Sequence, residues 1–342
     1  MKKALITGIA GQDGYFLAQL LLGKGYEVHG LARRNSQQSL GSIDFLPKET
    51  KSKIIIQWGD VTDTFFIEEI AKKHQYDEIY HLAAQSFVGL SFTNPKLTYD
   101  INIGGTLNIA NAVKEFSPKS KVYFAATSEM FGKVMASPQN ETTPFYPRSP
   151  YGVSKLAGFW TMKNYREAYH LKFSSGILFN HESEMRGKEF VTRKVSTGVA
   201  EIKQGVRGII ELGNLDAMRD WGYAPEYTEA MWLMLQKDEP DDFVIATGEH
   251  HSIREFVEAA FGVIGIEIGW EGSGENEVGK NRKTGETVVK VDPQFYRPSE
   301  VDELIGDASK AKNVLGWLPK ITFKDLVRIM VEHDIATTEK RS

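Results

Sequence analysis

The chain has 342 residues, of which 41% are hydrophobic and 25% are charged, and this composition excludes a disordered or collagen-like chain. Its 41 basic and 45 acidic residues leave a formal net charge of −4, so no strong field attracts nucleic acid or an anionic membrane. The absence of cysteine excludes disulfides and thiolate metal sites. No apolar run approaches the ~18 residues that span a bilayer. We therefore expect a cytoplasmic protein without nucleic-acid or membrane partners, and we expect no metal.

Short apolar runs alternate with longer helical patterns in the first half of the chain. Strands are predicted at 4–7, 28–32, 53–57, 78–83, 121–126 and 173–179. Helices are predicted after Gly11, at 64–74, at about 97–116 and at 151–169. Strands that are apolar over much of their length are typical of a parallel sheet covered by helices on both faces. We therefore predict an α/β domain at residues 1–180, a doubly wound parallel sheet of Rossmann type.

The pattern changes at about residue 181. Helices predicted at 192–203, 225–236, 253–263 and 323–333 mix with isolated short strands such as 243–246. The polar segment 272–287 is predicted to be a surface loop. Residues 181–342 are expected to form a smaller mixed α/β region for the substrate, interleaved with the first domain. Because ligands of open α/β sheets bind outside the carboxyl ends of the strands, this region should close over that edge.

A glycine-rich turn follows the first predicted strand. Gly8, Gly11 and Gly14 give the spacing G-x-x-G-x-x-G, a variant of the dinucleotide fingerprint. Glycines let the backbone approach a pyrophosphate, whose charge meets the N-terminus of the following helix. This turn, with Gln12 and Asp13, is therefore predicted to bind a dinucleotide.

The end of the second predicted strand favours one of the two nicotinamide dinucleotides. NAD sites place an acidic residue there, whereas segment 33–36 of this chain reads Arg-Arg-Asn-Ser. Guanidinium groups and a hydroxyl suit a 2′-phosphate, so we predict NADP, with Arg33, Asn35 and Ser36 among its contacts. The alternative is a solvated basic pair in a loop.

The third predicted strand is followed by Asp60 and Val61. Asp60 is placed to meet the adenine of the cofactor. It could equally cap the next helix, because aspartate is a favoured N-cap residue.

The candidate catalytic groups lie in two short segments. Tyr151 has a lysine, Lys155, four residues further on, and residues four apart share one face of a helix. An ammonium beside a phenol lowers the pKa of the phenol toward that of a general base, although both could be unrelated surface residues. Thr127 and Glu129 follow the fifth strand, where the hydroxyl can bond the same substrate oxygen and the carboxylate supplies a second acid or base. Elimination of water beside a new ketone needs this second group.

Longer motifs surround these residues over nearly the whole chain. They lie at 6–14, 25–34, 127–129, 141–152, 176–183, 190–194, 219–222 and 296–298. With these motifs the chain resembles the extended short-chain dehydrogenase/reductases and, among them, the GDP-mannose 4,6-dehydratase family.

The resemblance implies the reaction and the catalytic roles. Tyr151 would take the proton of the sugar 4-hydroxyl as a hydride passes to NADP⁺, and Thr127 would hold that oxygen. Lys155 would bond the nicotinamide ribose and tune Tyr151. Glu129 would remove the hydrogen at C5 and help expel the 6-hydroxyl as water, after which the same hydride returns to C6. GDP-mannose would thereby become GDP-4-keto-6-deoxy-mannose.

The resemblance also implies the binding residues. Expected cofactor contacts, besides the glycine turn, are Leu82, Ala83, Ala84, Gln85, Ser86, Tyr151, Lys155, His181 and Arg186. Expected contacts with the GDP-sugar are Ser86, Thr127, Ser128, Glu129, Asn180, Val191, Lys194, Arg219, Arg297 and Glu300. Cations among them suit a diphosphate, which invites arginine.

Phe87, Leu97 and the pair Glu184-Met185 depart from the family's pattern in loops that could touch sugar or cofactor. A GDP-linked heptose or N-acetylhexosamine therefore stays open as an alternative to GDP-mannose. The competing hypotheses are a nucleotide-sugar 4-epimerase, which has no need of Glu129, and a non-catalytic nucleotide-binding module. A homodimer or homotetramer is expected, as is common among relatives, and segment 33–46 could contribute to an interface.

Overall fold

One parallel sheet organises the molecule, and the computed structural model describes residues 1–295 and 303–339 of it. Its order is β11-β6-β5-β4-β1-β2-β3, and every neighbouring pair is parallel. The strands are β1 (Lys3–Thr7), β2 (Glu27–Ala32), β3 (Ile54–Trp58), β4 (Glu78–His81), β5 (Lys121–Thr127), β6 (Phe173–Leu178) and β11 (Phe243–Ile245). The predicted doubly wound sheet is confirmed, and its strand order reverses between β1 and β4, where such sheets bind ligands.

The strands belong to a sheet that is covered on both faces. All residues of β4, β6 and β11 are buried. Strand β11 comes from the part of the chain assigned to the second region, yet it extends the main sheet beside β6. The predicted boundary between a first domain at 1–180 and a second region at 181–342 therefore stays a prediction.

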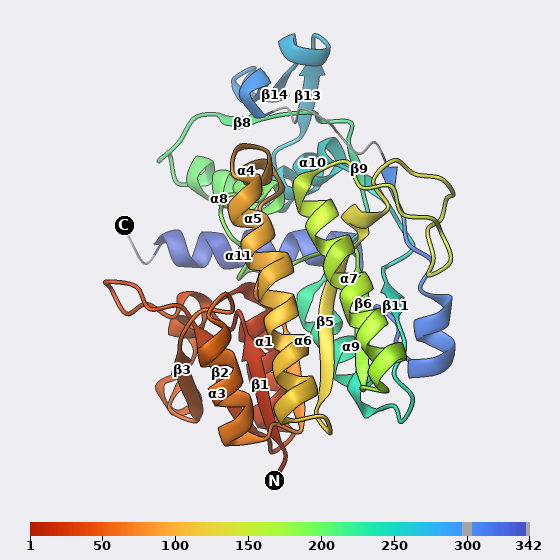
Figure 1. Cartoon of the computed structure of the whole chain (residues 1–342). Coiled ribbons are helices and arrows are strands. Elements are labelled where there is room, and N and C mark those ends of the chain that lie inside the picture. Colours follow the sequence, from red (N-terminus) through yellow and green to blue (C-terminus); the bar gives the residue numbers. More distant parts are fainter. Residues whose placement is uncertain (296–302, 340–342) are drawn as a thin grey trace.

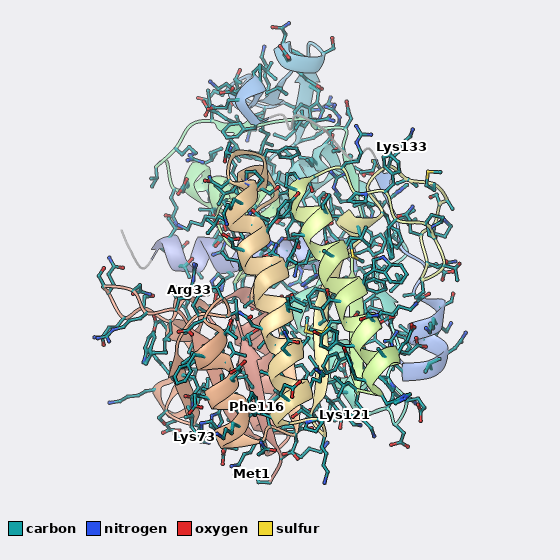
Figure 2. The ribbon with its side chains drawn as sticks, in the orientation of Figure 1. Met1, Arg33, Lys73, Phe116, Lys121 and Lys133 are labelled. Carbon is teal, nitrogen blue, oxygen red and sulfur yellow. The ribbon has the colours of Figure 1, made fainter. Side chains whose placement is uncertain are left out.

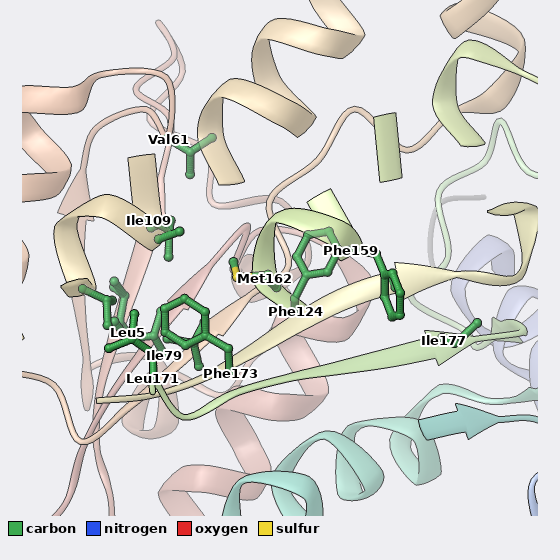
Figure 3. Close-up of a cluster of buried hydrophobic side chains, with 14 of the residues drawn as sticks. Leu5, Val61, Ile79, Ile109, Phe124, Phe159, Met162, Leu171, Phe173 and Ile177 are labelled. Carbon is green, nitrogen blue, oxygen red and sulfur yellow. The ribbon is translucent and has the colours of Figure 1, made fainter. Parts of the chain in front are cut away.

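Two hydrophobic clusters hold helices to the two faces of the sheet. One face carries α3 (Thr64–His74), α6 (Gly105–Phe116) and α7 (Pro150–Tyr169), and the last two cross in front of the sheet in Figure 1. Phe124 and Phe173 of the sheet pack there with Phe159 and Met162 of α7 (Figure 3). The other face carries α1 (Gln12–Gly23) and α9 (Ala224–Gln236). The predicted helices 64–74 and 151–169 are confirmed.

The predicted helix at 97–116 consists of three elements. They are α5 (Pro95–Tyr99), a π-helical turn (Asp100–Gly104) and α6. In the turn, Asn102 donates to the Ser154 hydroxyl (2.9 Å) and to the Gln85 carbonyl (3.1 Å), and its Oδ1 accepts from the Gln85 N–H (2.8 Å). The wider turn thus lets one buried amide tie the segment after β4 to α7. π-bulges are frequent at functional sites.

A third core lies beyond the carboxyl ends of the sheet, in the upper part of Figure 1. It joins α8 (Val191–Lys203), α10 (Ile253–Val263) and α11 (Phe323–Glu339) to a small sheet of order β13-β14-β15-β8. The strands of this sheet are β8 (Ile210–Leu212), β13 (Ile268–Glu271), β14 (Val278–Asn281) and β15 (Thr287–Val291). The prediction of a loop at 272–287 is wrong, because β14 lies within it. The polar residues of this strand concealed it.

Further short elements lie between these. The helices are α2 (Lys48–Lys51) and α4 (Val88–Thr93), and the strands are β7 (Asn180–Glu182), β9 (Met218–Arg219), β10 (Trp221–Tyr223), β12 (His251–Ser252) and β16 (Glu303–Leu304). Strand β7, which directly follows β6 in the chain, pairs in parallel with β10. Within the described ranges, no helix combines the length and the apolar character that crossing a membrane requires.

Replacement of Phe173 by alanine tests the core of Figure 3. Phe173 is 0% exposed, so the free energy of unfolding should fall by about 3–5 kcal/mol. Phe65→Ala is the control, because its ring is 73% exposed, and it should cost less than about 0.5 kcal/mol. Urea unfolding followed by circular dichroism measures both, and equal losses would contradict the assigned core.

Candidate active site

A cavity of about 710 Å³ lies at the carboxyl ends of the central strands. Its wall combines the turn after β1, the ends of β2, β5 and β6, the segment after β4 and the first turn of α7. Arg33, at the end of β2, marks this edge of the sheet in Figure 2, where Met1, Phe116 and Lys121 lie at the opposite end. The cavity therefore occupies the edge that the sequence predicts for ligands.

The glycine turn allows a backbone-to-backbone approach at the cavity floor. Gly8 has φ +71°, and a Cβ there would lie 2.8 Å from the Cα of Ala83. A Cβ on Gly14 would lie 2.3 Å from the carbonyl oxygen of Ile9. Gly11 is the N-cap of α1, so the free N–H groups of this helix begin at the cavity wall. This cradle fits a pyrophosphate.

The segment after β4 is held against this turn by a buried polar group. The Thr7 hydroxyl oxygen accepts hydrogen bonds from the N–H groups of Leu82 and Ala83, both at 3.1 Å. It also contacts Nδ1 of His81 at 2.8 Å. Burial lowers the pKa of His81 to about 3, so its ring is neutral and serves as a fixed hydrogen-bonding group.

The first turn of α7 brings Tyr151 to the cavity. Ser149 caps the helix by accepting a hydrogen bond from the Gly152 N–H (3.0 Å), and Pro150 occupies the first turn, where a missing N–H costs nothing. A Cβ on Gly152 would lie 2.8 Å from the Glu129 carbonyl oxygen. Glycine at this position thus lets α7 lie directly against the turn that carries Glu129.

Thr127, Ser128 and Glu129 form that turn. Strand β5 ends at Thr127, whose hydroxyl accepts a hydrogen bond from the Glu129 N–H at 3.2 Å. All three residues are buried and line the cavity together with Tyr151. A phenol, a hydroxyl and a carboxylate therefore face one space.

Burial controls the protonation of the two catalytic candidates on α7. It raises the pKa of Tyr151 to about 12, against a hydrogen bond from Thr127 that lowers it, and the Glu129 charge adds to the rise. Burial lowers the pKa of Lys155 to about 8, while its Nζ donates to the Ala125 carbonyl at 2.7 Å. In the protein alone Tyr151 is thus a protonated phenol at neutral pH.

Most of the predicted cofactor residues line this cavity. They are Gly8, Gly11, Gln12, Asp13, Gly14, Arg33, Asp60, Val61, Leu82, Ala83, Ala84, Gln85, Ser86, Tyr151, Lys155, His181 and Arg186. Their roles as contacts stay predictions. Asp60 bonds the N–H and hydroxyl of Thr62, both at 2.9 Å, and the N-cap of α3 is Asp63, so Asp60 does not cap that helix.

Asn35 and Ser36 are not among the lining residues, and both are exposed. The Asn35 amide donates to the Ser39 carbonyl (2.8 Å) and accepts from the Ser39 N–H (3.0 Å), which closes its own loop. Arg34 is also absent from the wall. The structure therefore brings only Arg33 of this segment to the cavity.

The predicted substrate residues divide into two groups. Ser86, Thr127, Ser128, Glu129 and Asn180 line the cavity. Val191, Lys194 and Arg219 lie on α8 and β9 and do not, and Arg297 and Glu300 lie outside the described residues.

Apolar residues in the wall were not predicted as site residues. Phe87, Leu90, Leu97, Ile101 and Phe190 line the cavity. The rings of Phe87 and Phe190 meet edge to face, 5.9 Å apart, and the Arg186 guanidinium lies 3.6 Å over the Phe190 ring. The departures at Phe87 and Leu97 were the signal that could have identified this wall.

Comparison with known proteins assigns the chain to a family. The family model described as GDP-mannose 4,6 dehydratase matches residues 5–330. The chain belongs to the GDP-mannose 4,6-dehydratase family. Relatives named GDP-mannose 4,6 dehydratase are 54% identical in Homo sapiens (97% of this chain, 91% of the relative) and 53% identical in Cricetulus griseus (98% and 91%). A Yersinia enterocolitica relative named GDP-mannose 4,6-dehydratase is 46% identical (100% and 96%).

Solved structures share the fold over nearly the whole chain. A Thermus thermophilus UDP-glucose 4-epimerase complex with NAD has a TM-score of 0.79 at 25% identity (97% of this chain, 98% of that chain). A Bacillus anthracis dTDP-glucose 4,6-dehydratase in complex with NAD has a TM-score of 0.80 at 21% identity (99% and 98%). This chain therefore has the fold of these nucleotide-sugar enzymes.

The approach of α7 to the Glu129 turn can be tested by adding one methyl group. Gly152→Ala should lower the free energy of unfolding by about 1–3 kcal/mol, because the Cβ meets a backbone oxygen that must shift. Gly23→Ala is the control, since a Cβ at Gly23 in α1 meets nothing within 4 Å, and it should stabilise the protein by about 0.5 kcal/mol. Chemical denaturation measures both free energies of unfolding. If Gly152→Ala stabilised the protein as much as Gly23→Ala, the close approach of α7 to the Glu129 turn would be contradicted.

Proposed function

We propose that the protein converts GDP-mannose to GDP-4-keto-6-deoxy-mannose and water, with NADP as a cofactor that ends the cycle as it began. The observation that carries this proposal is the placement of Tyr151 and Glu129 on one cavity wall. The names of the relatives that match nearly the full chain support the substrate.

The residues around the cavity fit a nicotinamide dinucleotide. The glycine turn and the N-terminus of α1 would hold its pyrophosphate, and Asp60 lies where the adenosine half would reach β3. The guanidinium of Arg33 would pair with a 2′-phosphate, which supports NADP over NAD. The nicotinamide, when bound, supplies a hydride acceptor and a positive charge.

Tyr151 would act as the base at the sugar 4-hydroxyl. Its pKa of about 12 in the protein alone is too high for this task at neutral pH. Positive charge from Lys155 and from an oxidised cofactor would favour the phenolate and bring the pKa down. The Thr127 hydroxyl, already bonded to the phenol, would hold the substrate oxygen beside it.

Glu129 would act on the hydrogen at C5. A ketone at C4 acidifies that hydrogen, so a carboxylate can remove it. The same group, once protonated, can hand the proton to the departing 6-hydroxyl. Return of the hydride to C6 then requires one proton at C5, and release of the proton that Tyr151 took from the 4-hydroxyl balances it. The buried position of Glu129 keeps bulk water from competing for this proton.

The GDP half would extend toward α8 and β9, where Lys194 and Arg219 lie beyond the cavity wall. Arg186 lies between the cavity and the region expected to bind the GDP half, because it lines the cavity in the segment that leads to α8. The identity of the hexose, the oligomeric state and the cytoplasmic location stay predictions.

Replacement of Glu129 by glutamine separates dehydration from simple redox chemistry. Product formation from GDP-mannose, followed by the alkali-induced absorbance of the 4-keto sugar, should fall about 10²–10⁴-fold, because the acid–base group at C5 is lost. Partial reduction of the cofactor should persist, because Tyr151 is intact. Glu69→Gln on the exposed side of α3 is the matched control and should leave turnover unchanged.

Two results would contradict this assignment. Full turnover by the Glu129→Gln variant would remove Glu129 from the mechanism. Inversion at C4 without loss of water, in the unaltered enzyme, would indicate a 4-epimerase instead.

Replacement of Arg33 tests cofactor choice. Arg33→Ala should weaken NADP⁺ binding by about 10–100-fold and NAD⁺ binding by little, because only NADP⁺ carries the 2′-phosphate. Arg34→Ala is the matched control, since Arg34 does not line the cavity, and its effect should be smaller. Titration calorimetry measures both affinities, and equal losses for the two cofactors would contradict the role of Arg33.

A further inference from the structure

One ion pair connects the glycine turn with the segment after β6. Nε2 of His181 lies 2.9 Å from Oδ2 of Asp13, and Nδ1 lies 2.8 Å from the Phe179 carbonyl oxygen. The two side chains are mostly buried, with 12% and 21% exposure. Asp13 is in the first turn of α1, so this contact spans two parts of the chain that are far apart in sequence.

The hydrogen bonds determine the protonation of His181. A carbonyl oxygen only accepts, so Nδ1 carries a proton and donates it to Phe179. An ionised carboxylate also only accepts, so Nε2 must carry a proton to bond Asp13. With Asp13 ionised, both contacts are satisfied together by an imidazolium ring. A neutral ring would need a protonated Asp13 as the donor to Nε2, and the lowered pKa of Asp13 disfavours that state.

The charges around the pair favour this state. Burial alone would raise the pKa of Asp13, but His181, Gln12 and Arg186 outweigh it and hold that pKa below its usual range. Burial alone would lower the pKa of His181, but Asp13 and the Phe179 carbonyl outweigh it and raise that pKa above its usual range.

Further packing fixes the imidazolium in place. The ring of Tyr227 stacks on His181 with centroids 4.7 Å apart and planes at 17°, which is favourable for a cation over an aromatic face. Gly222 is paired with His181 in register, and a Cβ there would lie 2.2 Å from the Tyr227 ring. Gln12 donates to Asp13 Oδ1 (3.1 Å) and to the His181 carbonyl (3.0 Å).

The charged and titratable groups that face the pair come from four elements. Arg186 follows β7 and forms an ion pair with Glu182 at 3.1 Å, and its charge opposes that of His181. Tyr227 belongs to α9, and its pKa is raised well above the usual value by burial. Tyr123 of β5 and Tyr151 and Lys155 of α7 all lie within the field of Asp13.

Asp13 without this partner would oppose the cofactor. Its carboxylate lines the same cavity as the glycine turn, where a pyrophosphate would bind. Two anions in one desolvated space repel each other strongly. The imidazolium of His181 cancels the charge of Asp13 and leaves its geometry intact.

We propose that His181 is a positioning residue that strengthens dinucleotide binding through its effect on Asp13. As an imidazolium, His181 anchors the glycine turn to β7. It also neutralises the Asp13 carboxylate, which would otherwise repel the pyrophosphate. This inference rests on the proposed binding of a nicotinamide dinucleotide. It differs from a role of His181 as a direct cofactor contact, because the effect of His181 would depend on Asp13.

The pH dependence of binding follows from the raised pKa of His181. The imidazolium is present below that pKa and is lost as the pH rises through it, so affinity for NADP⁺ should fall about tenfold across the titration of His181. By reciprocity, bound NADP⁺ should raise the pKa of His181, which the imidazole resonances in NMR spectra report.

Two single variants and their double variant test the proposal. His181→Gln should weaken NADP⁺ binding about tenfold, because Asp13 stays charged. Asp13→Asn should lose the part of the alkaline fall that follows His181, because a neutral His181 can accept a hydrogen bond from the new amide. The double variant should recover most of the affinity that His181→Gln loses. His333→Gln on α11 is the matched control and should change nothing.

Calorimetry distinguishes the alternatives. A double variant as weak as His181→Gln would overturn the proposal and indicate a direct contact between His181 and the cofactor. If His181→Gln does not fold, the part of the alkaline fall that follows the titration of the His181 imidazole resonances decides the matter, because Lys155 also loses its proton near pH 8. Persistence of that part in Asp13→Asn overturns the proposal, and its disappearance supports it. Failure of the wild type to bind NADP⁺ and NAD⁺ would overturn the proposed function itself.

Discussion

The contact between the first turn of α7 and the turn after β5 is the constraint on which the site depends. Gly152 lies against the Glu129 backbone so closely that no larger residue fits without movement. This contact fixes the separation of Tyr151 from the Thr127–Glu129 turn, since each is held by its own backbone. The sheet beneath supplies a rigid base, and helix periodicity places Lys155 one turn further along the same face.

Burial gives this arrangement its chemical character. It keeps the phenol of Tyr151 protonated and lowers the pKa of Lys155, so the protein alone does not create a strong base. In the same cavity, with Tyr151 and Lys155 within the field of Asp13, the Asp13–His181 pair places two opposite charges together. The site is therefore nearly balanced in charge, and ligands would change that balance.

The sequence predicted what depends on local pattern. Apolar runs and helical spacing identified the central strands, and the glycine spacing, the Tyr151–Lys155 spacing and the strand ends identified the cavity wall. Features that depend on distant partners escaped prediction. The π-helical turn at Asn102 is stabilised by Gln85 and Ser154, and the Asp13–His181 pair joins residues that are 168 positions apart in the sequence. Three of the four residues of β14 are only partly buried, which suits its polar side chains, and the Asn35 amide forms its hydrogen bonds with Ser39 in its own loop.

The central claim is that a phenol and a carboxylate on one wall act on neighbouring positions of one sugar, so that a hydride taken at one carbon is returned two carbons away. GDP-mannose labelled with deuterium at C4 tests this most directly, with the product analysed by NMR and mass spectrometry after turnover in ordinary water. The account predicts that the deuterium is found at C6 of the 4-keto product without dilution. Deuterium retained at C4, or replaced at C6 by hydrogen from the solvent, would contradict it.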